Sequence, residues 1–218
     1  MAKSQYIEES VALPGREAQI DSGELHAVFG DPLKRYDDPQ SDVSSGVKRL
    51  IVGMGCFWGA ERIFWQHDGV LSTAVGYAGG LTPNPTYKEV CSGMTGHTEV
   101  VQIYFDPQRA PLRSLLKLFW ERHDPTQGMR QGNDIGTQYR SALYWCAPED
   151  EAVIRESVNL YQAILAEGGA PLALGHEVTT ELRATPTFYY AEEFHQQYLH
   201  KNPNGYCGLR GTGAVCPL

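Results

Sequence analysis

At 218 residues, the chain is long enough to bury the hydrophobic core of a single domain. Its formal net charge of −8 at pH 7 argues against a nucleic-acid or anionic-membrane partner, because either would call for a basic patch. No stretch reaches the ~18 apolar residues of a membrane span, and residues 1–10 lack the apolar segment of a signal peptide. We therefore expect a cytoplasmic protein without a membrane partner, and a monomer.

Residues 1–47 form a polar N-terminal extension that shows no sustained helix or strand period. Prolines and glycines recur along it: Pro14, Gly15, Gly23, Gly30, Pro32 and Pro39. This composition predicts coil that wraps the body of the protein. At Lys48 the pattern changes to that of a compact domain, which we place at residues 48–200, followed by a flexible tail over residues 201–218.

The stretch Leu50–Gly59 is the one around which the rest of the chain is organised. It begins as a short apolar run, typical of a strand buried on both faces, and continues as an amphipathic helix to about Asp68. Cys56 therefore falls at a strand-to-helix turn, where Gly53 and Gly55 permit a sharp bend. The free amides at the start of a helix favour an anion and would stabilise a Cys56 thiolate. A cysteine beside aromatic residues can equally be a small buried hydrophobe, and these residues alone leave both interpretations open.

A strand is predicted from Val70 to Tyr77, and a loop rich in Gly, Pro and Asn, Thr82–Tyr87, follows it, with a second loop at Cys91–His97. The next segment, Thr98–Phe105, alternates as a half-buried strand and places Glu99 in phase with its apolar residues. A carboxyl group at the end of an apolar row is partly desolvated, which raises its pKa and would let it donate a proton near neutral pH. If the end of the strand frays, Glu99 lies in solvent instead.

A core helix is expected at Leu112–Phe119, followed by a long polar loop at 124–140 and a strand at Ser141–Trp145. A second helix at 148–168 and two short strands at Val178–Leu182 and Thr187–Tyr190 complete the order. A loop as long as 124–140 in a compact domain is often part of a functional site.

The cysteines do not predict a disulfide scaffold. There are five of them, an odd number, in a chain too long to need disulfides for stability. We interpret Cys91 and Cys146 as structural, with Cys146 buried on a strand. Cys207 and Cys216 lie in the glycine-rich tail, and we do not expect them in the core.

Two alternatives involve the cysteines and histidines. His195, His200, Cys207 and Cys216 gather near the C-terminus, but their spacings of five, seven and nine residues are longer than those of paired zinc ligands. We therefore expect no metal, and we interpret the two histidines as surface or packing residues. A cysteine hydrolase or acyltransferase would instead combine Cys56 as nucleophile, His97 as base and Asp134 as the residue that orients the base.

A redox sensor whose cysteines form a switch disulfide would leave Glu99 and the pair Phe57 and Trp58 without a role. One further interpretation uses all of these features. A Cys56 thiolate attacks an oxidised substrate and becomes a sulfenic acid, and a cysteine of the mobile tail then resolves it to a disulfide that the second tail cysteine passes on.

Several segments, in order, resemble motifs of the peptide methionine sulfoxide reductase A family, from about residue 48 to the C-terminus: Gly55–Gly59, Gly79–Tyr87, Gly96–Glu99, Gln131–Ser141 and Gly205–Gly208. The resemblance implies an α/β (α+β) fold, a two-layer α/β sandwich around a mixed sheet with a ferredoxin-like core, and coil extensions at both ends. It implies an enzyme that needs no cofactor. The implied reaction reduces methionine S-sulfoxide, free or in oxidised proteins, with thioredoxin as the final reductant.

The resemblance also implies a role for each matching residue. Cys56 would be the nucleophile, and Glu99 would donate a proton to the sulfoxide oxygen, which is a poor leaving group until it is protonated. Tyr87 and Tyr139 would donate hydrogen bonds to that oxygen, and Phe57 and Trp58 would form a slot for the S-methyl group. Asp134 would position a water molecule. Cys207 would resolve the sulfenic acid, and Cys216 would act in recycling.

Overall fold

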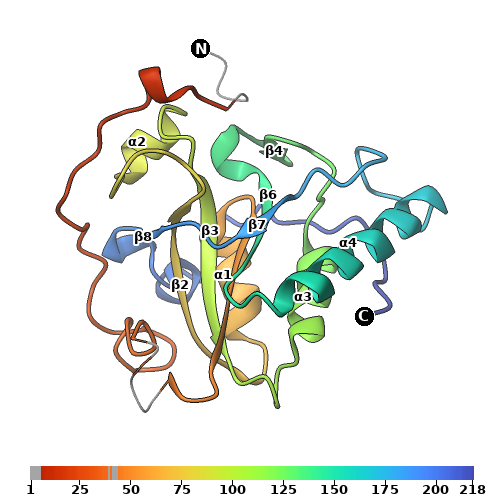
Figure 1. The fold of residues 1–218 in the computed structure, drawn as a ribbon, viewed down its shortest axis with the longest axis horizontal. Helices are drawn as coiled ribbons and strands as arrows, with labels where there is room; N and C mark the ends of the chain where they lie inside the picture. Colours follow the sequence, from red (N-terminus) through yellow and green to blue (C-terminus); the bar gives the residue numbers. More distant parts are fainter. Residues whose placement is uncertain (1–5, 39, 41–43) are drawn as a thin grey trace.

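The structure, a computed structural model, describes residues 6–38, 40 and 44–218, and it is an α/β protein (Figure 1). One mixed sheet of six strands in the order β7-β6-β1-β3-β2-β8 forms its centre. The strands are β1 Lys48–Met54, β2 Val70–Ala78, β3 Thr98–Phe105, β6 Ser141–Trp145, β7 Glu181–Ala184 and β8 Phe188–Tyr190. Among the described residues, β6 and β7 are the one parallel pair of neighbouring strands in this sheet, and the other neighbouring pairs are antiparallel. The predicted mixed sheet is confirmed.

The helices connect the strands of this sheet. Between β1 and β2 runs α1, and between β3 and β6 run α3 and a short ribbon of two strands. Their bounds are α1 Phe57–Trp65, α2 Tyr87–Cys91, α3 Leu112–Arg122, α4 Asp150–Ala166 and α5 Tyr198–Lys201, with the ribbon at β4 Arg130–Gln131 and β5 Asp134–Ile135. The two-layer sandwich and the ferredoxin-like core stay predictions.

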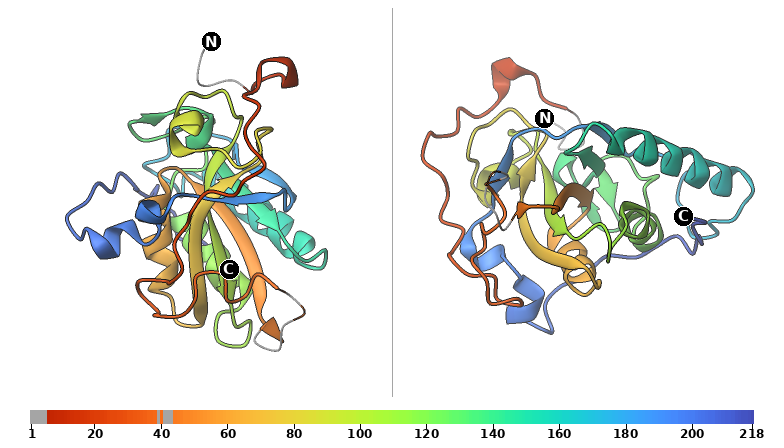
Figure 2. Two further views of the ribbon diagram at one scale, coloured as in Figure 1. Left: turned by 90° about the vertical axis from the view of Figure 1, so that its left-hand side faces the viewer. Right: turned by 60° about the horizontal axis from the view of Figure 1, so that its bottom comes forward.

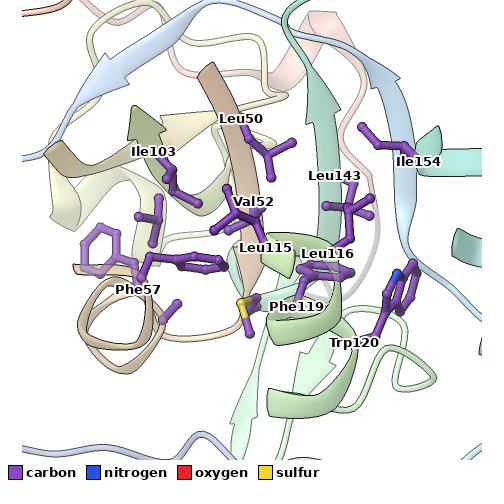
Figure 3. Close-up of a cluster of buried hydrophobic side chains, with 14 of the residues drawn as sticks. Leu50, Val52, Phe57, Ile103, Leu115, Leu116, Phe119, Trp120, Leu143 and Ile154 are labelled. Carbon is purple, nitrogen blue, oxygen red and sulfur yellow. The ribbon is translucent and has the colours of Figure 1, made fainter. Parts of the chain in front are cut away.

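Strand β1 is buried on both faces, as its apolar run predicts. Leu50 and Val52 point into the main hydrophobic cluster beneath α1 and α3, whereas Ile51 belongs to a smaller cluster with Val100 on the opposite face. Figure 3 shows residues of α3 and the side chain of Phe57 converging on this main cluster. The strand therefore carries its C-terminal end, and the turn at Cys56, out of a rigid core.

Several elements differ from the sequence-based expectation. The loop expected at 124–140 contains the ribbon of β4 and β5. The strand expected at Val178–Leu182 begins later, at β7, and α2 was not expected at all because Gly, Pro and Asn dominate its surroundings. The signal for α2 is a capping box: the Thr86 side chain accepts a hydrogen bond from the Glu89 amide, and the Glu89 carboxylate accepts one from the Thr86 amide.

The described parts of the N-terminal extension and the C-terminal tail pack on the body. Described residues of the extension run along the side of the molecule that carries α2 and β8 (Figure 1 and Figure 2), and His26 and Leu33 among them are buried. The C-terminal tail buries Thr212, Ala214 and Cys216, so the expectation that neither tail cysteine lies in the core is wrong for Cys216. In the part of the chain that the structure describes, no helix combines the length and the hydropathy needed to cross a bilayer.

Candidate active site

Cys56 is the N-cap residue of α1, two residues after the last residue of β1, Met54. Gly55 has φ of +87°, and a Cβ on it would lie 2.6 Å from the side chain of Gln131, so the turn requires glycine here. Burial and the carboxylate of Glu99 raise the pKa of the Cys56 thiol, while hydrogen bonds from the amides of Trp58 and Gly59 lower it. The helix start acts as predicted, but burial outweighs it, so the resting Cys56 thiol keeps its proton.

Glu99 lies on β3 and is 1% exposed, so the strand does not fray at this end. Burial is the main cause that raises the pKa of Glu99 to about 8; a hydrogen bond from the Phe57 amide lowers it, and the negative charge of Asp134 adds a smaller increase. That amide donates to Oε2 over 3.1 Å, which ties the carboxyl group to the start of α1. The predicted burial of Glu99 is confirmed, and with this pKa the carboxyl group mostly carries its proton near pH 7.

Two phenols lie near Glu99 but come from different segments. Tyr87 is the first residue of α2, and Tyr139 ends a single 3-10 turn at Thr137–Tyr139. Burial raises the pKa of both hydroxyls, and the charge of Glu99 is the next cause in each case. Both phenols therefore remain hydrogen-bond donors across the physiological pH range. The pKa of Tyr139 also responds to Asp134 and Cys56, which places these groups around one centre.

An aromatic wall adjoins Cys56. Phe57 is buried and Trp58 is half-buried, and the Trp58 ring stacks on Tyr198 with centroids 3.9 Å apart. The Trp58 indole Nε1–H donates to Nδ1 of His195 over 3.1 Å. The His195 ring lies 5.1 Å from that of Phe57 and 4.5 Å from that of Tyr87. From the sequence, His195 was expected only as a surface or packing residue. Its contact with Trp58, 137 positions earlier in the chain, follows from no local pattern.

The tail reaches the same region. The Tyr206 hydroxyl donates to Oδ2 of Asp134 over 3.2 Å, a contact that the sequence did not predict. Next to it, Cys207 is exposed, and its Sγ lies 2.9 Å from the point that a Cβ on Gly59 would occupy. The first turn of α1 therefore carries Cys56 at its start and Cys207 against its surface. All five cysteines lie among the described residues, and Cys56, Cys146, Cys207 and Cys216 have free thiols.

The other cysteines have different surroundings. Cys216 packs on α3, where its amide donates to Oε1 of Glu121 over 2.9 Å and its carbonyl accepts from Lys117 over 2.7 Å. Cys91 ends α2, and its side chain hydrogen-bonds that of Tyr87. Cys146 is half-buried rather than buried, and it follows β6 instead of lying on it.

His97 does not serve as a base for Cys56. Its Nδ1 accepts from the Gly80 amide over 3.0 Å, and its Nε2–H donates to the carbonyl of Thr82 over 2.7 Å. Burial lowers the pKa of His97 to about 4. Both nitrogens hold loop backbone, so the alternative trio of Cys56, His97 and Asp134 is wrong. Within the described ranges, no three His, Cys, Asp or Glu side chains cluster as a metal site.

Buried neutral histidines predict a loss of stability in acid. Burial lowers the pKa to about 4 for each of four: His26, His97, His123 and His195. Because these groups have an ordinary pKa near 6.5 when unfolded, the unfolded chain binds more protons between pH 4 and 6.5. The free energy of unfolding should therefore fall by roughly 2 kcal/mol per pH unit on acidification through this window, after allowance for the opposing carboxyls.

Those carboxyls, Glu61 and Glu99, have pKa values raised to about 7 and about 8, so they contribute a decline in stability as pH rises from 4.5 through these values. Urea unfolding followed between pH 4.5 and 8.5 should show maximal stability near pH 6.5. A stability that rises steadily up to pH 8.5 would contradict the assigned protonation states.

The comparisons with known proteins agree with this geometry. The family model described as peptide methionine sulfoxide reductase matches residues 48–215. Peptide methionine sulfoxide reductase MsrA of Brucella melitensis is 56% identical over 99% of this chain and 94% of the relative, and that of Vibrio cholerae is 56% identical over 94% and 92%. Among solved structures, methionine sulfoxide reductase A of Corynebacterium diphtheriae is 42% identical with a TM-score of 0.80, covering 93% of each chain. Reduced Mxr1 of Saccharomyces cerevisiae is 35% identical with a TM-score of 0.65, covering 79% of this chain and 91% of that one.

The family match covers the Cys56 turn, the buried Glu99 and the tail beside Gly59, and the identity extends over nearly the whole chain. The chain therefore belongs to the peptide methionine sulfoxide reductase family and is an enzyme that reduces methionine sulfoxide.

Proposed function

We propose that the enzyme acts on the S epimer of methionine sulfoxide, free or in oxidised proteins, with Cys56 as nucleophile and Glu99 as proton donor. The observation that carries this proposal is the protonated, buried carboxyl group of Glu99 hydrogen-bonded to the first turn of the Cys56 helix. A sulfoxide oxygen becomes a leaving group once it is protonated, and Glu99 holds a proton near neutral pH for that step.

The proposed reaction balances as follows. The sulfur of Cys56 attacks the sulfoxide sulfur while Glu99 protonates the oxygen, and the proton of the Cys56 thiol replaces the one that Glu99 lends. The sulfur–oxygen bond of the substrate breaks, the oxygen passes to Cys56 as a sulfenic acid, and methionine leaves. Because the resting thiol has a raised pKa, we propose that it loses its proton only as the substrate gains one.

The phenols and the aromatic wall would orient the substrate. Tyr87 and Tyr139 keep their protons, and we propose that both donate hydrogen bonds to the sulfoxide oxygen. Phe57 and Trp58 would enclose the S-methyl group in an apolar slot. One methyl group in such a slot contributes only about 1–3 kcal/mol, so discrimination between epimers requires placement of the oxygen as well.

The tail would complete the cycle. Cys207 is exposed beside the first turn of α1, and we propose that its thiol attacks the Cys56 sulfenic acid, forming a disulfide and releasing water. Asp134 would position water at this stage, supported by its contact with Tyr206. For Cys216 to act in recycling, the segment around it must first leave its buried place on α3.

A thioredoxin-type dithiol is the proposed final reductant. The yeast relative Mxr1 has been solved in complex with Trx2. For this chain, the proposal rests on the exposure of Cys207, because an external dithiol must reach one sulfur of the disulfide.

Cys207→Ser tests this cycle. The variant should still release one equivalent of methionine per enzyme, because Cys56 and Glu99 are intact, but it should not turn over with thioredoxin. Rapid-quench assays of methionine give the first quantity, and steady-state assays coupled to thioredoxin give the second. Cys146→Ser is a matched control that should behave as wild type, since Cys146 lies after β6 beside Arg49. Full thioredoxin turnover in Cys207→Ser would assign resolution to another cysteine.

A further inference from the structure

The N-terminal extension crosses the loop that leads into α2. We call residues 13–17 the strap. Its backbone is bound at two points: the Leu13 amide donates to the Met94 carbonyl over 2.9 Å, and the Arg16 amide donates to the Pro83 carbonyl over 3.1 Å. The Asn84 side-chain amide returns a hydrogen bond to the Arg16 carbonyl over 3.0 Å. The strap lies outside the family match, which covers residues 48–215. It nevertheless binds the loop directly before α2, the helix whose first residue is Tyr87.

Gly15 lets the strap approach this loop. Its φ is +66°, and a Cβ built on it would lie 2.2 Å from the carbonyl oxygen of Pro83, which no packing adjustment of a side chain can relieve. Gly30, in the same extension, also has a positive φ, of +76°, but a Cβ on it would meet nothing within 4 Å. Both glycines have a backbone conformation that favours glycine, but of these two only Gly15 also lacks the space for a Cβ.

Arg16 extends the strap to the capping box of α2. Its guanidinium donates to both carboxylate oxygens of Glu89, over 2.9 and 2.7 Å, and to the Asn84 carbonyl over 2.7 Å. The same carboxylate accepts from the Thr86 amide over 2.8 Å. The hydrogen bond from Arg16 is the main cause that lowers the pKa of Glu89 to about 2, so the carboxylate stays charged and available to both partners.

Tyr87 directly follows Thr86, and α2 has only five residues. A helix this short is not stable by itself, so its orientation depends on its tertiary contacts. These include the burial of Val90 in the main hydrophobic cluster and, at the first turn, the bond from the Tyr87 amide to Oε1 of Glu192, over 2.8 Å, and the capping box that Arg16 holds.

We propose that the strap is a positioning element of the reductase: Arg16, acting through Glu89, fixes the first turn of α2 and with it the Tyr87 hydroxyl that binds the sulfoxide oxygen. The inference rests on the proposed role of Tyr87. The strap residues do not touch the reacting atoms, so their loss should slow the reduction step without changing the resolution of the sulfenic acid by Cys207.

The pair Gly15→Ala and Gly30→Ala isolates the contact from the backbone conformation. In Gly15→Ala the strap must leave the loop, and we expect the single-turnover rate of methionine release to fall roughly tenfold, because small displacements of a positioning group have effects of that order or larger. Gly30→Ala should keep the wild-type rate. Arg16→Gln, which loses the charge and the paired hydrogen bonds, is the second variant and should show a similar loss, partly restored in Arg16→Lys.

The decisive experiment repeats these measurements in a Tyr87→Phe background. If the strap acts through the Tyr87 hydroxyl, Gly15→Ala and Arg16→Gln should cause no further loss there. A slow Tyr87→Phe enzyme that loses another tenfold on addition of Gly15→Ala, or a Gly15→Ala enzyme with the wild-type rate, would overturn the inference and leave the role of Tyr87 intact. A wild-type rate in Tyr87→Phe alone would overturn the role of Tyr87 and the inference with it.

Discussion

Glu99→Gln should slow the first turnover by roughly 100- to 10,000-fold, the range in which general acids contribute. Glutamine keeps a hydrogen-bond donor at this buried position but has no proton to transfer, so the sulfoxide oxygen would leave unprotonated. The measurement is methionine released in a single turnover, by rapid quench, with enzyme in excess over substrate. Glu99→Asp is the matched control: it retains a carboxyl group and should recover part of the rate, limited by the shorter side chain.

The pH profile gives an independent test of the same residue. Since burial raises the pKa of Glu99 to about 8, the single-turnover rate of the wild type should decline as pH rises through 8, where the carboxyl group loses its proton. Glu99→Gln should lack this decline because it has no group to titrate there. A wild-type rate in Glu99→Gln, or an unchanged alkaline decline in that variant, would show that another group supplies the proton.

Cys56→Ser should abolish methionine release, because a serine hydroxyl cannot accept the oxygen in place of a thiol. The fold should survive the change. Cys56 is the N-cap of α1, and serine is among the preferred N-cap residues because its oxygen can accept hydrogen bonds from the amides of the first turn. Urea unfolding of the variant should therefore show a stability equal to or above that of the wild type. Such a result would separate lost chemistry from lost structure.

The sequence predicts the parts of this site that depend on local periodicity. Period-two alternation places Glu99 on the apolar side of β3, and the change from an apolar run to a helical pattern locates Cys56 at the start of α1. Both features depend on neighbours within a few residues. The pKa of Cys56 does not: the helix amides are visible in the sequence, but the degree of burial that outweighs them is set by the whole fold.

Contacts between distant segments account for what the sequence missed. His195 reaches Trp58 only because the segment after β8 folds back over α1, and no spacing encodes that. The tail reads as mobile from its glycines, yet the Thr212 hydroxyl pairs with that of Tyr161 and Cys216 is bound on α3. Composition indicates coil, but it does not indicate whether the coil packs against the body.

The measurement that tests the central claim most directly uses each separated epimer of methionine sulfoxide with dithiothreitol as reductant. We expect methionine release from the S epimer by the wild type, none from the R epimer, and none from either by Cys56→Ser. Release from the R epimer at a comparable rate would contradict the proposed placement of the oxygen, and release by Cys56→Ser would contradict the nucleophile.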